Sequence, residues 1–151
     1  MKNIILFLFL FFLNSCGYTS IYKNQKSQDF QINIIEMTGD NVINNLIKNE
    51  LKFYSNRNSN IKYDISINSN YQKVIVSKNS AGVATDYKLI AETVISFDKD
   101  DKDNILNFNE SINIKNNSNF NEQNNYEKNI KKNFASTISN KFIIKILFLP
   151  S

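Results

Sequence analysis

The stretch that decides the fold is Thr85–Phe97, TDYKLIAETVISF, which has the pattern of one long β-strand. Apolar, aromatic or β-branched side chains occupy every second position: Tyr87, Leu89, Ala91, Thr93, Ile95 and Phe97. Such alternation is typical of a strand with one buried face, because successive side chains of a strand point to opposite sides of the sheet. The stretch therefore predicts a half-buried strand.

A second alternating stretch follows the charged segment Asp98–Asn104. Its apolar positions are Leu106, Phe108, Ile112 and Ile114, with Glu110 interrupting the pattern on the same face. Two such strands joined by a charged turn predict an antiparallel hairpin. The turn, DKDDKD at Asp98–Asp103, superficially resembles a calcium loop, but it lacks the central glycine and the closing glutamate of the EF-hand pattern. We therefore expect no metal site there.

A strand, a helix and a further strand are predicted before this hairpin. Asp29–Met37 alternates at Phe30, Ile32 and Ile34, with Ile35 and Met37 out of phase, which favours a strand. Thr38-Gly39-Asp40 is a turn in which Asp40 could cap the helix that follows. The helix is predicted over Val42–Tyr54 from the helical spacing of its apolar residues: Val42, Ile43, Leu46, Ile47, Leu51 and Tyr54.

The next strand begins at Ile61 and leads toward a glycine-containing turn at Asn79–Val83. Its apolar residues are Ile61, Tyr63, Ile65 and Ile67, and then Val74 and Val76. Because the last two have moved from odd to even positions, the pattern predicts a bulge or a turn near Ser69-Asn70.

A long helix closes the chain. It is predicted from about Glu122, with apolar residues at every fourth position: Tyr126, Ile130, Phe134 and Ile138. The last stretch, Phe142–Leu149, is apolar on nearly every side, and periodicity alone does not separate a helix from a buried strand there. We assign it to the end of the helix.

The predicted elements together specify an α+β fold. We expect a two-layer sandwich in which two helices cover one face of a mixed, mostly antiparallel sheet of about four strands. All of these elements belong to residues 29–151, which are expected to form a single domain.

The N-terminus has the pattern of a bacterial lipoprotein precursor. Residues 1–15 combine Lys2 with the apolar run Ile4–Leu13, which is too short to span a bilayer and is typical of a signal peptide. The run ends at Ser15-Cys16-Gly17, where small Ser15 would precede the cleavage site and Cys16 would become the lipidated first residue. Residues 16–28 then form a tether. The alternatives are an ordinary cleaved signal peptide with an incidental thiol, or an uncleaved anchor.

Composition argues against catalysis and against nucleic-acid binding. The chain has no histidine, one cysteine and three glycines, so histidine-based triads, imidazole metal sites and a phosphate-cradling loop are not expected. The net charge of +4 is spread along the chain rather than gathered in one basic cluster. We predict a protein that is not an enzyme and uses no cofactor.

The order and spacing of these features resemble the LPS-assembly lipoprotein family (LptE). The family begins its mature chain with Cys-Gly-aromatic, enters its central hairpin through a glycine-containing turn, and ends in a long helix. The matching residues here are Cys16-Gly17-Tyr18, then Ala81-Gly82-Val83-Ala84-Thr85-Asp86-Tyr87 followed by Lys88–Phe97, and the helix through Asn133-Phe134-Ala135.

The resemblance implies a function without covalent chemistry. The lipoprotein would be anchored on the periplasmic face of the outer membrane. Gly17 agrees with this location, because in such lipoproteins an Asp after the cysteine often means retention at the inner membrane. It would plug a β-barrel partner (LptD), help that barrel to assemble, and engage lipopolysaccharide. The alternative is an auxiliary lipoprotein, or binding module, of another envelope lipid-transport system.

Two departures from the family pattern affect the expected lipid contact. The entry to the last helix, Phe120–Gln123, lacks a Lys or Arg. Some members carry a basic residue directly after the turn glycine, where this chain has Val83. Lys78 and Lys88 flank the turn and could take over contact with lipid phosphates, since a lysine acts as a point charge toward phosphate. The simpler interpretation is that both are solvated lysines on strand ends.

Overall fold

The structure is a computed structural model that describes residues 30–99 and 102–148. The predicted signal peptide, Cys16 with its flanks Ser15 and Gly17, and the tether lie outside the described residues. In chain order the elements are β1 (Phe30–Gly39), α2 (Asn41–Ser55), β2 (Ile61–Lys78), β3 (Ala84–Lys99), β4 (Lys102–Lys115) and α3 (Phe120–Leu147).

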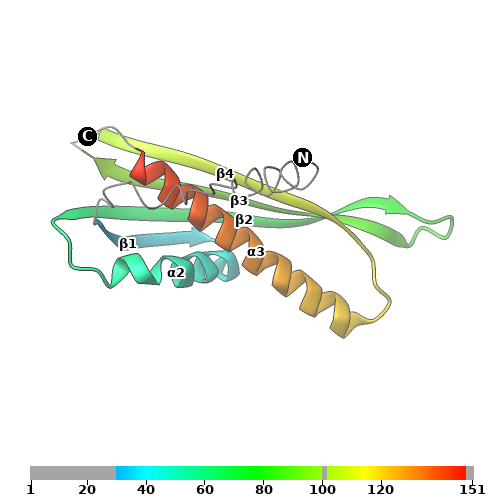
Figure 1. The fold of residues 1–151 in the computed structure, drawn as a ribbon. Helices are drawn as coiled ribbons and strands as arrows, with labels where there is room; N and C mark the ends of the chain where they lie inside the picture. The colour runs from blue at the N-terminus through cyan, green and yellow to red at the C-terminus, as the bar shows by residue number, and fades with distance from the viewer. Residues whose placement is uncertain (1–29, 100–101, 149–151) are drawn as a thin grey trace, which may run out of the picture.

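The strands form a single four-stranded sheet in the order β1-β2-β3-β4 (Figure 1). β1 pairs with β2 in parallel, while β2 with β3 and β3 with β4 pair antiparallel. The stretch Thr85–Phe97 thus lies in an inner strand, and its predicted hairpin with the following strand is confirmed. The sheet is mixed and mostly antiparallel, as expected.

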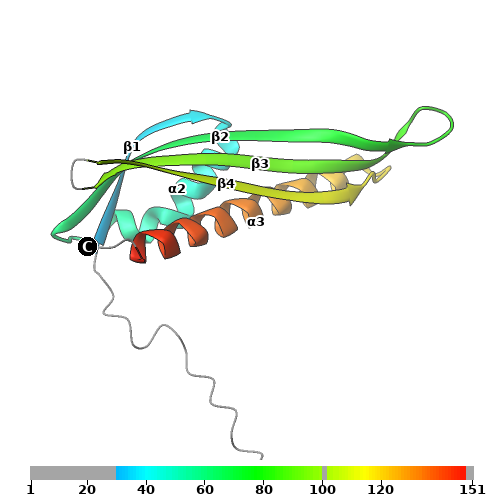
Figure 2. The same cartoon turned by 90° about the horizontal axis from the view of Figure 1, so that it is seen from above.

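Both helices pack on the same face of this sheet (Figure 2). α2 contacts β1 and β2, α3 contacts β3 and β4, and the two helices contact each other. Each helix turns an apolar stripe toward the sheet: Ile43, Ile47 and Leu51 in α2, and Ile130, Phe134 and Ile138 in α3. The α+β two-layer sandwich is therefore confirmed.

The connection from β1 to α2 depends on Gly39 and Asp40. Gly39 has a φ of 85°, in the left-handed region that side chains disfavour. The next residue, Asp40, donates its backbone N–H to the Ser69 carbonyl at 2.6 Å. Its carboxylate accepts the Ile43 N–H at 2.8 Å, which confirms the predicted helix cap. The turn thus stops β1 and starts α2 within two residues.

Phe142 packs the C-terminal part of α3 against β3 and β4. Its side chain is fully buried and meets the Phe97 and Phe108 rings edge-on, at centroid distances of 6.1 and 6.5 Å. Phe97 in turn meets Tyr63 edge-on at 5.8 Å. Aromatic pairs of this geometry add to the free energy of burial. The apolar C-terminal run is therefore helix up to Leu147, as predicted, with Phe142, Ile143 and Ile146 in the core. Leu149 lies outside the described residues.

Phe142→Ala is expected to lower the free energy of unfolding by about 4 kcal/mol, because it leaves a cavity between α3 and two strands. Chemical denaturation followed by circular dichroism measures the change. Phe120→Ala is the matched control, since Phe120 lies on the same helix but is 74% exposed, and it should cost less than about 0.5 kcal/mol. Equal losses from the two variants would contradict this assignment of the core.

Some details differ from the sequence prediction. β2 is continuous through Ser69-Asn70, so the bulge predicted there is wrong; irregularities occur instead between Ile75 and Lys78, and between Ile34 and Glu36 in β1. Val74 and Val76 change phase because the end of β2 is exposed, and no buried face fixes its alternation.

The last helix begins earlier than predicted, at Phe120, with Asn119 as its cap. Tyr126 is 51% exposed, so it is wrongly included in the buried stripe. It lines an open hollow between the end of β4 and the first turns of α3. Glu110, which interrupts the pattern of β4, forms an ion pair with Lys141 of α3.

Candidate functional site

The part of the molecule that stands out from the sandwich is the end of the β2–β3 hairpin. Residues 70–92, here called the distal hairpin, continue β2 and β3 beyond the last residue pair between β1 and β2, which joins Gly39 and Ser69. Its tip extends past the end of β4 and past the first turn of α3 (Figures 1 and 2). Side chains near the tip therefore have few neighbours within the domain.

The turn at the tip is held by Asn79. Its side-chain oxygen accepts the backbone N–H groups of Ala81 and Val83, each at 3.0 Å, and its backbone N–H donates to the Val83 carbonyl at 2.9 Å. Gly82 supplies a φ of 79° inside the turn. These bonds give the tip a defined conformation, and the predicted turn at Asn79–Val83 is confirmed.

Apolar side chains are exposed along this hairpin. Val74, Ile75 and Val76 follow one another in β2 and are 44%, 48% and 54% exposed, and Val83 in the turn is 56% exposed. Neighbouring exposed apolar side chains are a common feature of surfaces that bind a partner or a lipid. The distal hairpin is therefore the candidate interaction site of the domain.

The two lysines predicted near the turn lie on this hairpin but do not form one site. Lys88 is opposite Val74, four residues along β2 from Lys78, which corresponds to about 13 Å of strand. Lys88 also lies opposite Asn113, on the face that points away from the helices. Both lysines are exposed, and neither forms an ion pair with a described carboxylate. Each lysine can therefore act as a separate point charge, but the two do not form one binding site for a phosphate group.

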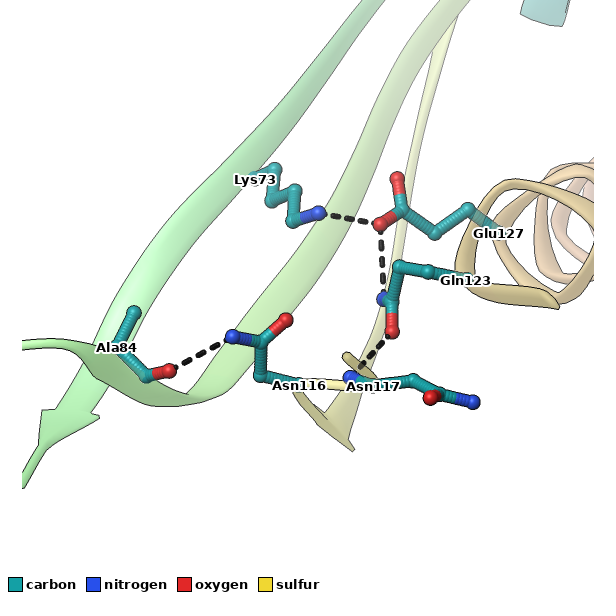
Figure 3. A network of polar contacts seen from close by, with 6 residues as sticks. All are labelled: Lys73, Ala84, Asn116, Asn117, Gln123 and Glu127. Atoms are coloured by element: carbon teal, nitrogen blue, oxygen red, sulfur yellow. Dashed lines mark hydrogen bonds and ion pairs between the residues drawn. The ribbon is translucent and has the colours of Figure 1, made fainter. Parts of the chain in front are cut away.

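A polar network connects the distal hairpin to the start of α3 (Figure 3). Lys73 of β2 forms an ion pair with Glu127 of α3, and Gln123 donates its side-chain N–H to the same carboxylate at 2.9 Å. The Gln123 oxygen accepts the Asn117 backbone N–H at 2.9 Å. Asn116 donates to the Ala84 carbonyl at 2.9 Å. The network fixes the hairpin relative to the helix.

Within this network, the pKa of Glu127 is shifted by its neighbours. Its partial burial raises the pKa, but hydrogen bonds from Lys73 and Gln123, together with the charges of Lys73 and Lys131, outweigh this effect, so the pKa lies below its ordinary value of 4.5. A carboxyl whose pKa is lowered by folding stabilises the folded state above that ordinary value. The contribution is lost as the pH falls through the lowered pKa.

Glu127→Gln should therefore make the stability less dependent on pH below about pH 4.5, and should cost at most about 1 kcal/mol at neutral pH, since the ion pair is partly solvated. Thermal unfolding between pH 3 and pH 7 measures both effects. Glu92→Gln provides the control, because Glu92 is exposed on the other face of the sheet. The interpretation fails if the two variants show the same pH profile.

A second polar cluster lies close to the turn. The Asp86 carboxylate accepts hydrogen bonds from Ser77 and, at 2.9 Å, from Thr85. These bonds, with a smaller contribution from the charge of Lys115, hold the pKa of Asp86 below its ordinary value. The cluster joins the two strands where the β2 bulge would otherwise loosen the hairpin.

Tyr71 lies at the inner end of the hairpin, beside α3. The Lys131 amino group is 3.9 Å from the centre of its ring. Burial, and then the charges of Glu127 and Asp40, raise the pKa of Tyr71 to about 12. The phenol therefore stays neutral at physiological pH, and it packs the hairpin against the helix.

Residues 30–99 and 102–148 contain no group of three or more side chains suited to hold a metal ion. Asp100 and Asp101, which belong to the acidic turn that resembles a calcium loop, lie outside this range. Neither helix in the described part of the chain is both long and apolar enough to cross a membrane.

Solved structures share this fold. The chain is similar to rare lipoprotein B from Shewanella oneidensis, with 11% identity and a TM-score of 0.54, covering 76% of this chain and 97% of that one. It is also similar to a minor lipoprotein from Acinetobacter baumannii, with 10% identity and a TM-score of 0.52, covering 74% of this chain and 90% of that one. A candidate lipoprotein from Caulobacter crescentus CB15 has 11% identity and a TM-score of 0.50, covering 82% of this chain and 95% of that one.

Comparison of the sequence itself finds neither a matching protein-family model nor a matching curated protein. At identities near 10%, the structural likeness establishes the fold alone.

Proposed function

We propose that this chain is an outer-membrane lipoprotein that plugs a β-barrel partner and helps it to assemble for lipopolysaccharide transport. The observation that carries the proposal is the fold, which covers at least nine-tenths of the two similar lipoprotein chains named above. The signal-peptide pattern that ends at Cys16 supports a lipid anchor independently of the fold.

The distal hairpin supports a role in handling an amphiphile. Its exposed valines and isoleucine suit acyl chains, while Lys78 and Lys88 are solvated charges that suit phosphate groups. No step in this function requires a bond to be made or broken, so the protein would act by position and contact rather than as an enzyme.

Co-purification tests the proposal. A C-terminally tagged chain, extracted from outer membranes in mild detergent, should bring a large β-barrel protein with it in roughly equal amount. Depleting the chain should lower the level of correctly folded barrel. Recovery of an inner-membrane ATPase in place of the barrel would instead favour an auxiliary lipoprotein of another lipid-transport system, and would overturn the proposal.

A further inference from the structure

The distal hairpin has an open strand edge in addition to its exposed side chains. β1 accompanies β2 only as far as Ser69, whose carbonyl accepts the Asp40 N–H. Over the next nine residues, Asn70–Lys78, β2 has β3 on one side and no described strand on the other. The outward N–H and C=O groups of this stretch are therefore available to another extended chain.

The side chains of this edge suit strand pairing. Val74, Ile75 and Val76 are β-branched and 44–54% exposed, so apolar contacts are available on both faces of the hairpin. The edge of β4 is also open, but its sequence between Asn107 and Asn113 is mostly Asn and Ser. Of these two edges in the described residues, the β2 edge carries the longer exposed apolar run, Val74-Ile75-Val76.

The charges along this edge indicate what kind of chain would pair with it. The stretch NYQKVIVSK carries Lys73 and Lys78 and no carboxylate. Lys73 forms an ion pair with Glu127, whereas Lys78 has no ion pair with a described carboxylate. A complementary segment would be extended and apolar in its middle, with an Asp or Glu near Lys78.

We infer that the β2 edge at Asn70–Lys78 accepts an extended segment of the β-barrel partner as a fifth strand of the sheet. This inference rests on the proposed function for the identity of the partner. It specifies the contact: main-chain hydrogen bonds give the affinity, and the flanking valines and isoleucine select an apolar segment.

Hydrogen exchange tests the inference on the unmodified protein. Outward amides within Asn70–Lys78 should exchange fast in the free chain and become protected in the co-purified complex. Amides at the outer edge of β4 should show no such change. Protection at β4 in place of Asn70–Lys78, or no protection at either edge in a complex that contains the barrel, would overturn strand addition and leave the proposed function intact.

A variant pair gives the second measurement. Val74→Lys combined with Val76→Lys places charges on the open edge and should remove the barrel from the eluate, with little change in the stability of the free chain. Ile105→Lys is the matched control, because Ile105 is 63% exposed on β4 at the opposite edge, and it should retain the barrel. Full barrel recovery with the double variant would refute strand addition; no barrel even with the unmodified chain would refute the proposed function itself.

Discussion

Gly39→Ala is expected to destabilise the domain by about 5 kcal/mol or more, which is close to the whole stability of a small protein. Two effects add. Gly39 has a φ of 85°, which costs a side-chain-bearing residue of order 1–3 kcal/mol. A Cβ at this position would also lie far inside van der Waals distance of the Ser69 carbonyl oxygen. That oxygen accepts the Asp40 N–H, so it cannot move without breaking the connection between β1 and α2.

Gly82→Ala separates the two effects. Gly82 has a nearly equal φ of 79°, but nothing lies within 4 Å of the position that a Cβ would take. The backbone strain alone should cost roughly 1 kcal/mol. Urea denaturation of both variants, followed by circular dichroism, measures the difference. Similar losses in the two variants would contradict the close approach of Gly39 to β2.

The sequence predicts the fold well wherever one face of an element is buried. The stretch Thr85–Phe97 alternates because Leu89, Ala91 and Ile95 lie fully buried under the helices while their neighbours do not. The same rule places α2 from Ile43, Ile47 and Leu51. In these elements the hydrophobic pattern and the packing express the same constraint, so the pattern alone is sufficient.

The prediction fails where that constraint ends. In the distal hairpin both faces of β2 are exposed around Val74 and Val76, so alternation no longer reports burial. The change of phase there predicts a bulge or a turn near Ser69-Asn70, but the register of β2 is unbroken through those residues. The exposed apolar run that forms the candidate site is visible in the sequence only once the ends of the core are known.

The polar network at the start of α3 has no distinct signal in the sequence. Asn116, Asn117 and Gln123 are polar residues in a segment rich in asparagine, and nothing marks them out from their neighbours. Glu127 is prominent only as an acidic residue early in a helix. Its contact with Lys73 joins residues 54 positions apart, and such a contact becomes predictable only when the register of the sheet is known.

Cys16→Ser should abolish acylation and release the mature protein from the membrane. Each buried methylene contributes about 0.8 kcal/mol, so two or three acyl chains would hold the protein on the membrane almost permanently. The lipid is attached through the cysteine sulfur, which a serine lacks. Metabolic labelling with a radioactive fatty acid and membrane fractionation measure both effects. Ser15→Ala is the control, because it keeps a small residue before the cleavage site and should leave labelling and location unchanged.

Gly17→Asp separates lipidation of the chain from its sorting to the outer membrane. If Gly17 helps to direct the lipoprotein to the outer membrane, an aspartate there should leave fatty-acid labelling intact but move the protein to the inner-membrane fraction. The barrel partner should then be absent from the purified material. Outer-membrane fractionation of Cys16→Ser would contradict the lipid anchor, whereas an unmoved but labelled Gly17→Asp would contradict only the sorting role of residue 17. The two variants therefore test separately whether the chain is anchored and where.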